Sequence, residues 1–164
     1  MIRVSYFSLI EIVVVILIIG VMMSFAVLSY DNDLPETRLK SVARSISSLL
    51  QTAHSRAKSQ GVPIVLEIDR EKGKISLSPW EGRLAEIKCP KEITIGDIRT
   101  MGGEEDEEII EYTFKPNSIN SSLIIELTNR EEKMVSVIYN ALMGTASLKD
   151  GLFEEQWVEE IARF

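Results

Sequence analysis

The chain has 164 residues, of which 45% are hydrophobic and 26% charged, and its formal net charge is −7. This length excludes a large multidomain enzyme, and the acidity disfavours nucleic acid as a default partner because phosphates would be repelled. The average composition conceals an asymmetry, since residues 7–28 hold 18 hydrophobic residues and a single charge, Glu11. The sequence therefore combines one apolar segment with one domain of mixed polarity. Its single cysteine, Cys89, excludes an intrachain disulfide.

The apolar segment, residues 7–28, has the length and composition of a transmembrane helix. Its 22 residues would extend about 33 Å as a helix, enough for the hydrocarbon core of a bilayer. A cleaved secretory signal peptide is the alternative, but such peptides have shorter apolar regions that end at small residues. Arg3 precedes the segment, and Asp31, Asp33 and Glu36 follow it. This charge distribution predicts a cytoplasmic amino terminus, with the rest of the chain across the membrane.

Glu11 is the unusual residue of this segment. An ionised carboxylate in the hydrocarbon region is costly unless a cation pairs with it, and no residue of the same helix can provide one. The partner must therefore come from another chain or from the lipid headgroups. The simpler alternative is a carboxylate that reaches the membrane surface or is protonated.

The start of the chain resembles the amino-terminal signal of type IV pilins and pseudopilins, because a short leader with one basic residue precedes Phe7-Ser8-Leu9-Ile10-Glu11 and an unbroken apolar run. The resemblance implies that a prepilin peptidase removes the leader, residues 1–6, by cleavage between Tyr6 and Phe7, and that the new Phe7 amine is N-methylated. It also implies that Glu11 pairs with the Phe7 amine of a neighbouring subunit, which supplies the buried counter-charge. The chain departs from the family at Tyr6, where glycine is usual.

The remaining residues, 29–164, are predicted to form a globular domain. Turn-forming residues at positions 30–35 predict a break or a bend in the helical pattern. Over residues 36–60 the apolar positions recur at three- and four-residue spacings, which predicts an amphipathic helix that ends at Gly61. His54 lies beside the apolar stripe. As the only histidine, it is expected to be a hydrogen-bonded residue at the edge of the core and not a metal ligand or general base.

Short β-type runs separated by polar turns predict an antiparallel sheet over residues 62–149. The charged turn Asp69–Gly73 predicts a hairpin between the first two runs. The predicted strands are 62–68, 74–78, 87–95 (interrupted by Pro90), 109–115, 123–128, 134–139 and 145–148. Because no long helix intervenes, the single amphipathic helix is expected to cover one face of this sheet, which gives an α+β fold.

Two further segments resemble minor pseudopilins of the GspH/FimT type: the helix-to-strand junction from Leu50 to Leu66, and Tyr112–Asn117 followed by two strands and Gly144. The resemblance covers about residues 7–149. It implies a pilin-like fold, in which a long amino-terminal helix, first transmembrane and then amphipathic, packs on an antiparallel sheet.

The same resemblance implies a function in filament assembly. The chain is similar to a minor pseudopilin of a type II secretion pseudopilus, held in the bacterial inner membrane with its domain in the periplasm. Its implied partners are other pilin-like subunits and the prepilin peptidase. A minor type IV pilin that initiates or decorates a pilus is the first alternative. The second alternative is an uncleaved, single-pass anchor that carries a ligand-binding ectodomain.

No pattern of a catalytic site is found in the sequence: there is no Gly-rich phosphate loop, no cysteine pair and no HExxH or GxSxG motif. We therefore expect no enzymatic activity, catalytic residue, cofactor or metal. The acidic run at residues 104–108 offers oxygen ligands for calcium but lacks the ligand spacing of an EF-hand, so it is expected to be a solvated, mobile loop. Basic residues such as Lys40 are expected to contact acids one helical turn away. Because these residues cluster only weakly and the carboxy-terminal half of the chain is acidic, DNA uptake is disfavoured.

Residues 150–164 lie beyond the family resemblance. Phe153, Trp157, Ile161 and Phe164 share one helical face, with glutamates on the other sides, which predicts a carboxy-terminal amphipathic helix that packs back on the domain. The alternative is an aromatic docking segment for a neighbouring subunit.

Overall fold

The structure, a computed structural model, describes residues 8–79, 85–100, 103–105, 107–117 and 120–151. For residues 23–34, 79, 104 and 105 it describes the backbone alone. Within this described part, one α-helix is followed by nine β-strands. The chain divides into two compact units, Met1–Pro35 and Glu36–Phe164.

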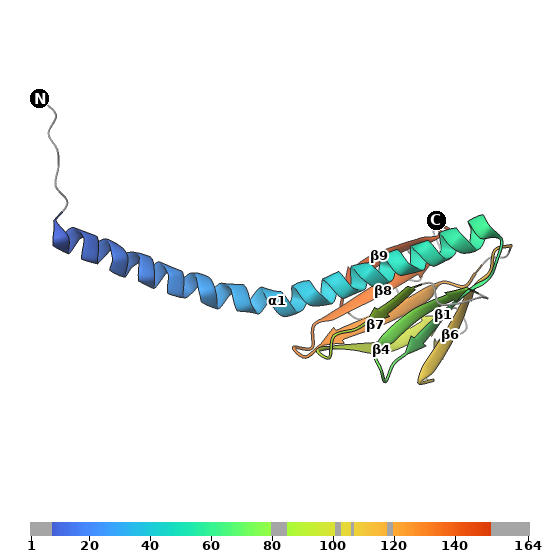
Figure 1. Cartoon of the computed structure of the whole chain (residues 1–164). Coiled ribbons are helices and arrows are strands. Elements are labelled where there is room, and N and C mark those ends of the chain that lie inside the picture. Colours follow the sequence, from blue (N-terminus) through green and yellow to red (C-terminus); the bar gives the residue numbers. More distant parts are fainter. Residues whose placement is uncertain (1–7, 80–84, 101–102, 106, 118–119, 152–164) are drawn as a thin grey trace, which may run out of the picture. The chain divides into compact units, whose positions relative to one another are not determined.

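Helix α1 runs from Leu9 to Gln60 and contributes to both units (Figure 1). The sequence left open whether residues 30–35 break or bend the helix, and the helix is continuous, with Pro35 inside it. Proline lacks an N–H group, so one intrahelical hydrogen bond is missing at this position. The helix ends as predicted: Gly61 adopts φ of +70°, and its N–H donates to the carbonyl of Ala57 at 3.1 Å.

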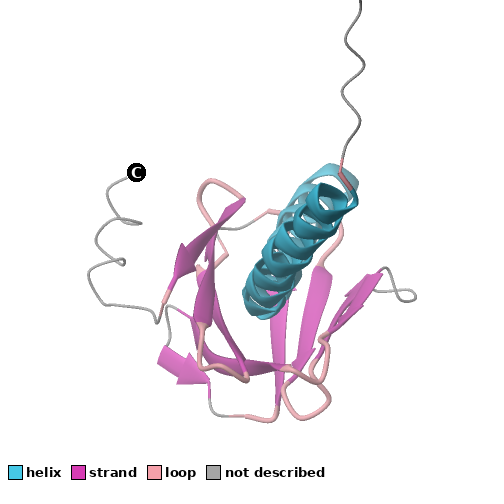
Figure 2. Cartoon of the chain, turned by 90° about the vertical axis from the view of Figure 1, so that its left-hand side faces the viewer, coloured by secondary structure: helices cyan, strands magenta, loops and turns pink. Residues whose placement is uncertain are grey.

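The strands form two antiparallel sheets, whereas the sequence predicted one. The first sheet has the order β3-β2-β1-β6 and the second has the order β5-β4-β7-β8-β9. The strands of the first sheet are β1 (Ile64–Asp69), β2 (Lys74–Pro79), β3 (Ala85–Lys88) and β6 (Ile109–Phe114). Those of the second are β4 (Ile93–Thr100), β5 (Gly103–Glu105), β7 (Leu123–Asn129), β8 (Met134–Asn140) and β9 (Thr145–Asp150). Figure 2 shows strands on both sides of the helix.

The division into two sheets occurs at Pro90, inside the segment 87–95 that was predicted as one interrupted strand. β3 ends at Lys88, and the N–H of Ile93 donates to the carbonyl of Pro90 at 2.9 Å in a turn. Because proline cannot donate to a strand ladder, the run cannot continue as one strand, and β4 joins the other sheet.

Part of the acidic run differs from the expectation of a loop, since Glu104 and Glu105 lie in a strand, whereas Glu107 and Glu108 are exposed and lie outside the strands. Gly103–Glu105 forms the short strand β5, which pairs with the end of β4 through Arg99 and Glu104. The prediction that a carboxy-terminal helix begins at residue 150 is wrong at its first residue, because Asp150 is the last residue of β9. Residues 152–164, which hold the rest of that prediction, lie outside the described residues.

The hydrophobic core lies between the amphipathic part of α1 and the inner faces of the two sheets. The apolar stripe predicted on residues 36–60 is buried as expected, with Val42 partly buried at its margin. The α1 residues of the core are Leu39, Ala43, Ile46, Leu49, Leu50, Ala53 and Ala57. Strand residues of both sheets, among them Ile64, Ile98 and Leu123, belong to the same cluster. The helix therefore joins the two sheets through one continuous core.

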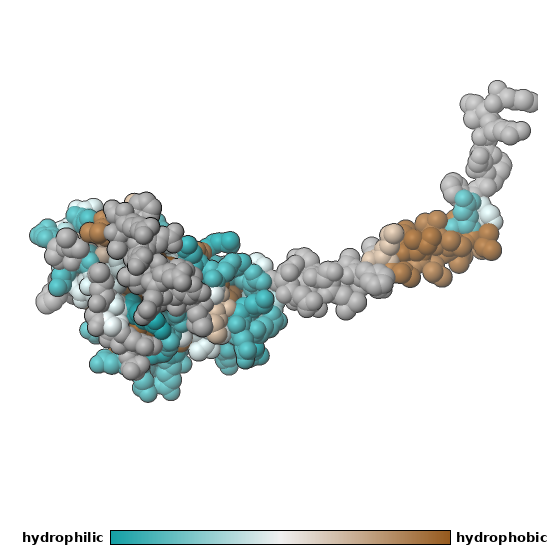
Figure 3. Space-filling model, turned by 180° about the vertical axis from the view of Figure 1, so that it is seen from behind, coloured by the Kyte–Doolittle hydropathy of each residue, from teal (hydrophilic) through white to brown (hydrophobic). Residues whose placement is uncertain are grey.

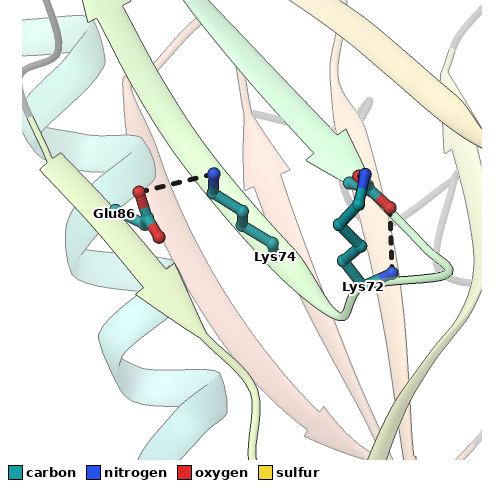
Figure 4. A network of polar contacts seen from close by, with 4 residues as sticks. Lys72, Lys74 and Glu86 are labelled. Carbon is teal, nitrogen blue, oxygen red and sulfur yellow. Dashed lines mark hydrogen bonds and ion pairs between the residues drawn. The ribbon is translucent and has the colours of Figure 1, made fainter.

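The hairpin between β1 and β2 confirms the predicted turn (Figure 4). Asp69 accepts hydrogen bonds from the backbone N–H of Lys72 at 2.9 Å and from its ammonium group at 2.7 Å, and these contacts lower the pKa of the Asp69 carboxyl. Gly73 adopts φ of +58°, which favours glycine. Beyond the turn, Lys74 and Glu86 form an ion pair of 3.5 Å between β2 and β3.

Candidate assembly site

The amino-terminal part of α1 presents apolar side chains that no other part of the described chain covers. Twelve large aliphatic side chains between Leu9 and Met22 are 47% to 81% exposed. They occupy nearly every position, so they lie on all sides of the helix and not on one stripe; Figure 3 shows them as a continuous hydrophobic band. A helix that is apolar all round is stable only when an apolar environment surrounds it. This surface therefore requires lipid or other protein chains.

Glu11 is the only acidic residue within this apolar region and lies in the first turn of α1. Its backbone N–H donates to the carbonyl of Ser8 at 3.0 Å, which fixes the start of the helix. A carboxylate in the first turn interacts favourably with the positive end of the helix dipole. Its side chain is exposed and forms no ion pair with a described residue. The geometry is that of a charged group available to a partner outside the described chain.

The two predicted processing residues, Tyr6 and Phe7, lie outside the described residues. Cleavage between them, methylation of Phe7 and its pairing with Glu11 therefore remain predictions. Within the described part of the chain, no helix is both long enough and apolar enough to cross a membrane. The span predicted over residues 7–28 also takes in residue 7 and the side chains of residues 23–28, which are not described.

A buried polar contact fixes the amphipathic part of α1 on the second sheet. His54, on α1, is 8% exposed, and its Nδ1 lies 2.5 Å from the hydroxyl of Tyr139 on β8. Tyr139 in turn makes edge-to-face ring contacts with Tyr112 and Phe114 of β6, with ring centroids 6.3 and 5.4 Å away. This aromatic group therefore links α1, the second sheet and the first sheet. It confirms the interpretation of His54 as a hydrogen-bonded core residue.

Burial determines the charge states of this group. It lowers the pKa of His54, with a smaller contribution from the positive charge of Lys58, and it raises the pKa of Tyr139 to about 12. Burial also raises the pKa of Tyr112, whose hydroxyl donates to the carbonyl of Ser121. At neutral pH the three side chains are therefore uncharged, and the contact between His54 and Tyr139 is a hydrogen bond between neutral groups.

Gly144 lies beside the His54 ring, a proximity that the sequence did not predict. It follows β8 with φ of +67°, and a Cβ atom placed on it would lie 2.5 Å from the His54 ring. The turn is held by Asn140, whose side chain accepts hydrogen bonds from the N–H groups of Leu142 and Met143. Local sequence indicates a turn at Gly144, but the contact with a helix ninety residues earlier is set by the fold.

The remaining predicted features lie at the surface. Lys40 contacts Glu36 one helical turn away at 2.8 Å, as expected, and also contacts Asp150 of β9 at 3.3 Å. Among the described residues, no group of three or more histidine, cysteine or acidic side chains is arranged to hold a metal. The side chains of Glu104 and Glu105, on which the calcium alternative depends, are not described.

Comparison with solved structures identifies the class of fold. Two structures of the minor pseudopilin EpsH from the type II secretion system of Vibrio cholerae match with TM-scores of 0.56 and 0.51 and sequence identities of 14% and 12%. The matches cover 72% and 69% of this chain and 98% and 97% of EpsH. The type IV minor pilin FimU of Pseudomonas aeruginosa matches with a TM-score of 0.50 and 14% identity, over 70% of this chain and 90% of FimU.

These similarities confirm the predicted pilin-like α+β fold, with an amino-terminal helix packed against antiparallel sheets. No family model matches the sequence, and comparison with curated proteins gives no significant match. The likeness therefore lies in the arrangement of α1 and the strands, at a level of identity that shows fold alone.

Proposed function

We propose that the chain is a minor pseudopilin-like subunit of an extracytoplasmic filament, and that it acts by assembly and not by catalysis. The observation that carries the proposal is the exposed apolar surface of α1 between Leu9 and Met22 on a chain with the pilin-like fold. In this proposal the bilayer of the inner membrane surrounds that surface before assembly, and the helices of neighbouring subunits surround it in the filament. Both environments remove this apolar area from water, and van der Waals packing between helices stabilises the assembled state.

Glu11 sets the register of this assembly. Helices that are apolar all round can slide past one another at little cost, whereas a buried carboxylate is stable only opposite a cation. After cleavage between Tyr6 and Phe7, the free amine of Phe7 on a neighbouring subunit supplies that cation. Prepilin peptidase is accordingly the processing partner, and the domain from residue 36 onward lies in the periplasm.

The type II secretion pseudopilus is the filament we favour, because the two structures with the higher TM-scores belong to a type II secretion pseudopilin. The similarity to FimU supports the second candidate, a minor type IV pilin. Deletion of the gene in its host discriminates the two: loss of protein secretion with normal pili supports the first, and loss of pili with normal secretion supports the second.

The register mechanism is tested by Glu11→Gln, which keeps the shape of the side chain and removes its charge. We expect normal insertion of this variant into the membrane and at least a tenfold loss of incorporation into filaments, measured by the amount of subunit in sheared filament fractions; tenfold corresponds to about 1.4 kcal/mol. The control is Ser8→Ala, which changes an exposed side chain in the same turn and should assemble normally. Normal incorporation of Glu11→Gln would refute the pairing.

Processing is tested separately by intact-mass analysis of the membrane-extracted chain. The proposal requires the loss of Met1–Tyr6 and the gain of one methyl group. An uncleaved chain that still enters filaments would exclude the Phe7 amine as the partner of Glu11. An uncleaved chain that never enters filaments would support the alternative of an anchored ligand-binding ectodomain.

A further inference from the structure

Strand β6 leaves one edge of the first sheet open. It pairs with β1 on one side, and no other described strand pairs with it (Figure 1). The other edge strands differ. β3 and β5 have only four and three residues, and β9 is contacted by α1, because Ser47 and Gln51 donate hydrogen bonds to its Ala146 carbonyl at 3.1 and 3.2 Å. Proteins usually shorten or cover edge strands because an open edge pairs readily with another chain. The six-residue strand β6 is the exception in this fold.

The hydrogen-bond register shows which backbone groups of β6 face outward. The N–H of Arg70 donates to the carbonyl of Glu108 at 3.0 Å, one step beyond the pair of Asp69 and Ile109. Hydrogen-bonded and non-hydrogen-bonded pairs alternate in an antiparallel ladder, so the even-numbered residues of β6 bond to β1. The odd-numbered residues direct their N–H and carbonyl groups away from β1, where no described residue bonds to them. These residues are Ile109, Glu111 and Thr113.

A groove of about 380 Å³ lies beside this edge. Its lining residues are Thr100 of β4, Glu107, Ile109, Ile110, Glu111 and Tyr112. Ile110 and Tyr112 belong to the core cluster and are 4% and 7% exposed, whereas Ile109 is 49% exposed on the outer side of the strand. A strand added beside β6 would place every second side chain next to Ile110 and Tyr112. Those positions favour apolar residues.

The outer side of the same edge carries two acids without a countercharge. Glu111 lies directly opposite Glu67 of β1 in a non-hydrogen-bonded pair, the geometry that brings cross-strand side chains closest. Like charges in this arrangement destabilise a sheet. Neither carboxylate forms an ion pair with a described residue, and Lys72, whose charge attracts Glu67, is paired with Asp69 at 2.7 Å instead. A basic side chain opposite Glu111 on an added strand would relieve this repulsion.

The described basic residues around β6 do not supply that cation. Arg70 and Arg99 both contact Asp97, at 3.7 and 3.9 Å. Lys115 lies beyond the end of β6, four residues and therefore about 13 Å along the strand from Glu111. The two exposed residues that precede β6 add further negative charge: Glu107 and Glu108. The edge is therefore complementary to a basic strand.

We propose that the open edge of β6 binds an extended segment of another protein by strand addition, and that apolar and basic residues alternate along this segment. The outward N–H and carbonyl groups of Ile109, Glu111 and Thr113 provide the main-chain hydrogen bonds, and the groove and the two acids provide selectivity. A second copy of this chain, with its net charge of −7, is repelled by the acidic edge. A single unassembled chain presents this edge, so the binding does not depend on the proposed filament function.

Backbone amide exchange, measured by NMR on the full chain in a non-ionic detergent, tests the proposal. The probe is a synthetic peptide of alternating lysine and valine, and the control peptide has the same composition with the lysines and valines in two blocks. We expect the alternating peptide to slow the exchange of the outward amides of residues 109, 111 and 113 at least about tenfold. The amides of residues 110 and 112, which already bond to β1, should change little. An equal effect of the block peptide, or protection without this alternation, would overturn the proposal.

Matched variants separate hydrogen bonding from charge, with peptide binding measured by titration of amide chemical shifts. Thr113→Pro removes an outward N–H that β1 does not use and should weaken binding at least about tenfold, whereas Thr113→Val keeps this N–H and should bind normally. Glu111→Gln should weaken binding about threefold, whereas Glu131→Gln, in the turn between β7 and β8, should not. Unchanged binding in Thr113→Pro or in Glu111→Gln would overturn the proposal.

Two further outcomes are decided by the exchange of the unsubstituted chain. If Thr113→Pro does not fold, the alternating protection of residues 109–113 by the peptide supports the proposal, and its absence overturns it. Protection of the outward amides without peptide, increasing with protein concentration, would also overturn it, because a second copy of the chain would then occupy the edge.

Discussion

At the scale of single residues, the buried His54 makes the stability of the domain depend on pH. Its pKa in the folded chain is lowered by burial, whereas in the unfolded chain it is about 6.5. Above the unfolded value both states are neutral and His54 adds no pH dependence. As pH falls below about 6.5, His54 binds a proton in the unfolded state but stays neutral in the folded state. The free energy of unfolding therefore decreases by up to about 1.4 kcal/mol per pH unit.

The measurement is urea unfolding of the full chain in detergent at pH 7.5 and 5.5, with expected loss of stability at the lower pH. His54→Gln keeps an acceptor for the Tyr139 hydroxyl but does not titrate, so it should remove most of this loss. The carboxyls with resolved shifts, Glu36 and Asp69, have lowered pKa values and titrate below this window. An unchanged pH dependence in His54→Gln would contradict the assignment.

Gly144 and Gly61 provide a matched pair of substitutions. Both have positive φ, +67° and +70°, but a Cβ on Gly144 would meet the His54 ring at 2.5 Å, whereas a Cβ on Gly61 would have no atom within 4 Å. Each change to alanine costs about 1 kcal/mol from the left-handed backbone conformation. Gly144→Ala should cost a further ~1–3 kcal/mol from overpacking. Thermal unfolding of both variants gives the difference, and His54→Ala should reduce the additional cost of Gly144→Ala.

The sequence predicts that His54 is a hydrogen-bonded residue at the edge of the core but does not predict which residues contact it. The importance of Glu11, by contrast, could be predicted from the sequence. The buried, hydrogen-bonded state of His54 follows from its place beside an apolar stripe and from the lack of other metal-ligating residues. Its partner Tyr139 lies 85 residues away, and Gly144 contacts it only because β8 and β9 pack beside α1. Glu11 needed no partner to be identified, since a charge in an apolar run is anomalous by itself.

At the scale of elements, the sequence predicted seven strands by alternation and turn residues, and missed how they pair. Alternation shows which residues of a strand face a core but contains no information on which strand lies beside it. Pro90 indicates an interruption in the run of residues 87–95. The sequence does not indicate that β3 and β4 belong to different sheets, which only the structure shows. The three-residue strand β5 is shorter than any alternating pattern that would identify it.

The two parts of α1 differ in exposure, and a pair of identical substitutions tests what each part contributes. Leu50 is fully buried in the core, whereas Leu17 is 64% exposed in the apolar band. Leu50→Ala should lower the stability of the domain by ~2–5 kcal/mol, because it removes buried contacts and leaves a cavity. Leu17→Ala has the same effect on helix propensity but should leave the domain's unfolding transition unchanged. Its expected effect is a reduced incorporation of the subunit into filaments. A large loss of domain stability in Leu17→Ala would contradict this division.

At the scale of the whole molecule, the chain joins two units with different solvent requirements. Among the residues whose side chains the structure describes, all those of the hydrophobic core lie between Leu39 and Ala141, with Ala146 and Leu148 packed against it, and so within the unit Glu36–Phe164. Removing Arg3 from the 18 basic residues, and Glu11, Asp31 and Asp33 from the 25 acidic ones, leaves this unit with a net charge of −5. The exposed apolar band belongs wholly to the other unit.

A fragment of residues 36–164 should therefore fold without detergent, as a soluble monomer with one cooperative unfolding transition, because it retains the whole core and sheds the apolar band. Size-exclusion chromatography with light scattering and thermal unfolding provide the measurements. The control is a fragment of residues 9–164, which carries the same core and should associate unless detergent is present. If residues 36–164 also associate or unfold without cooperativity, the part of α1 before Glu36 contributes to the stability of the domain.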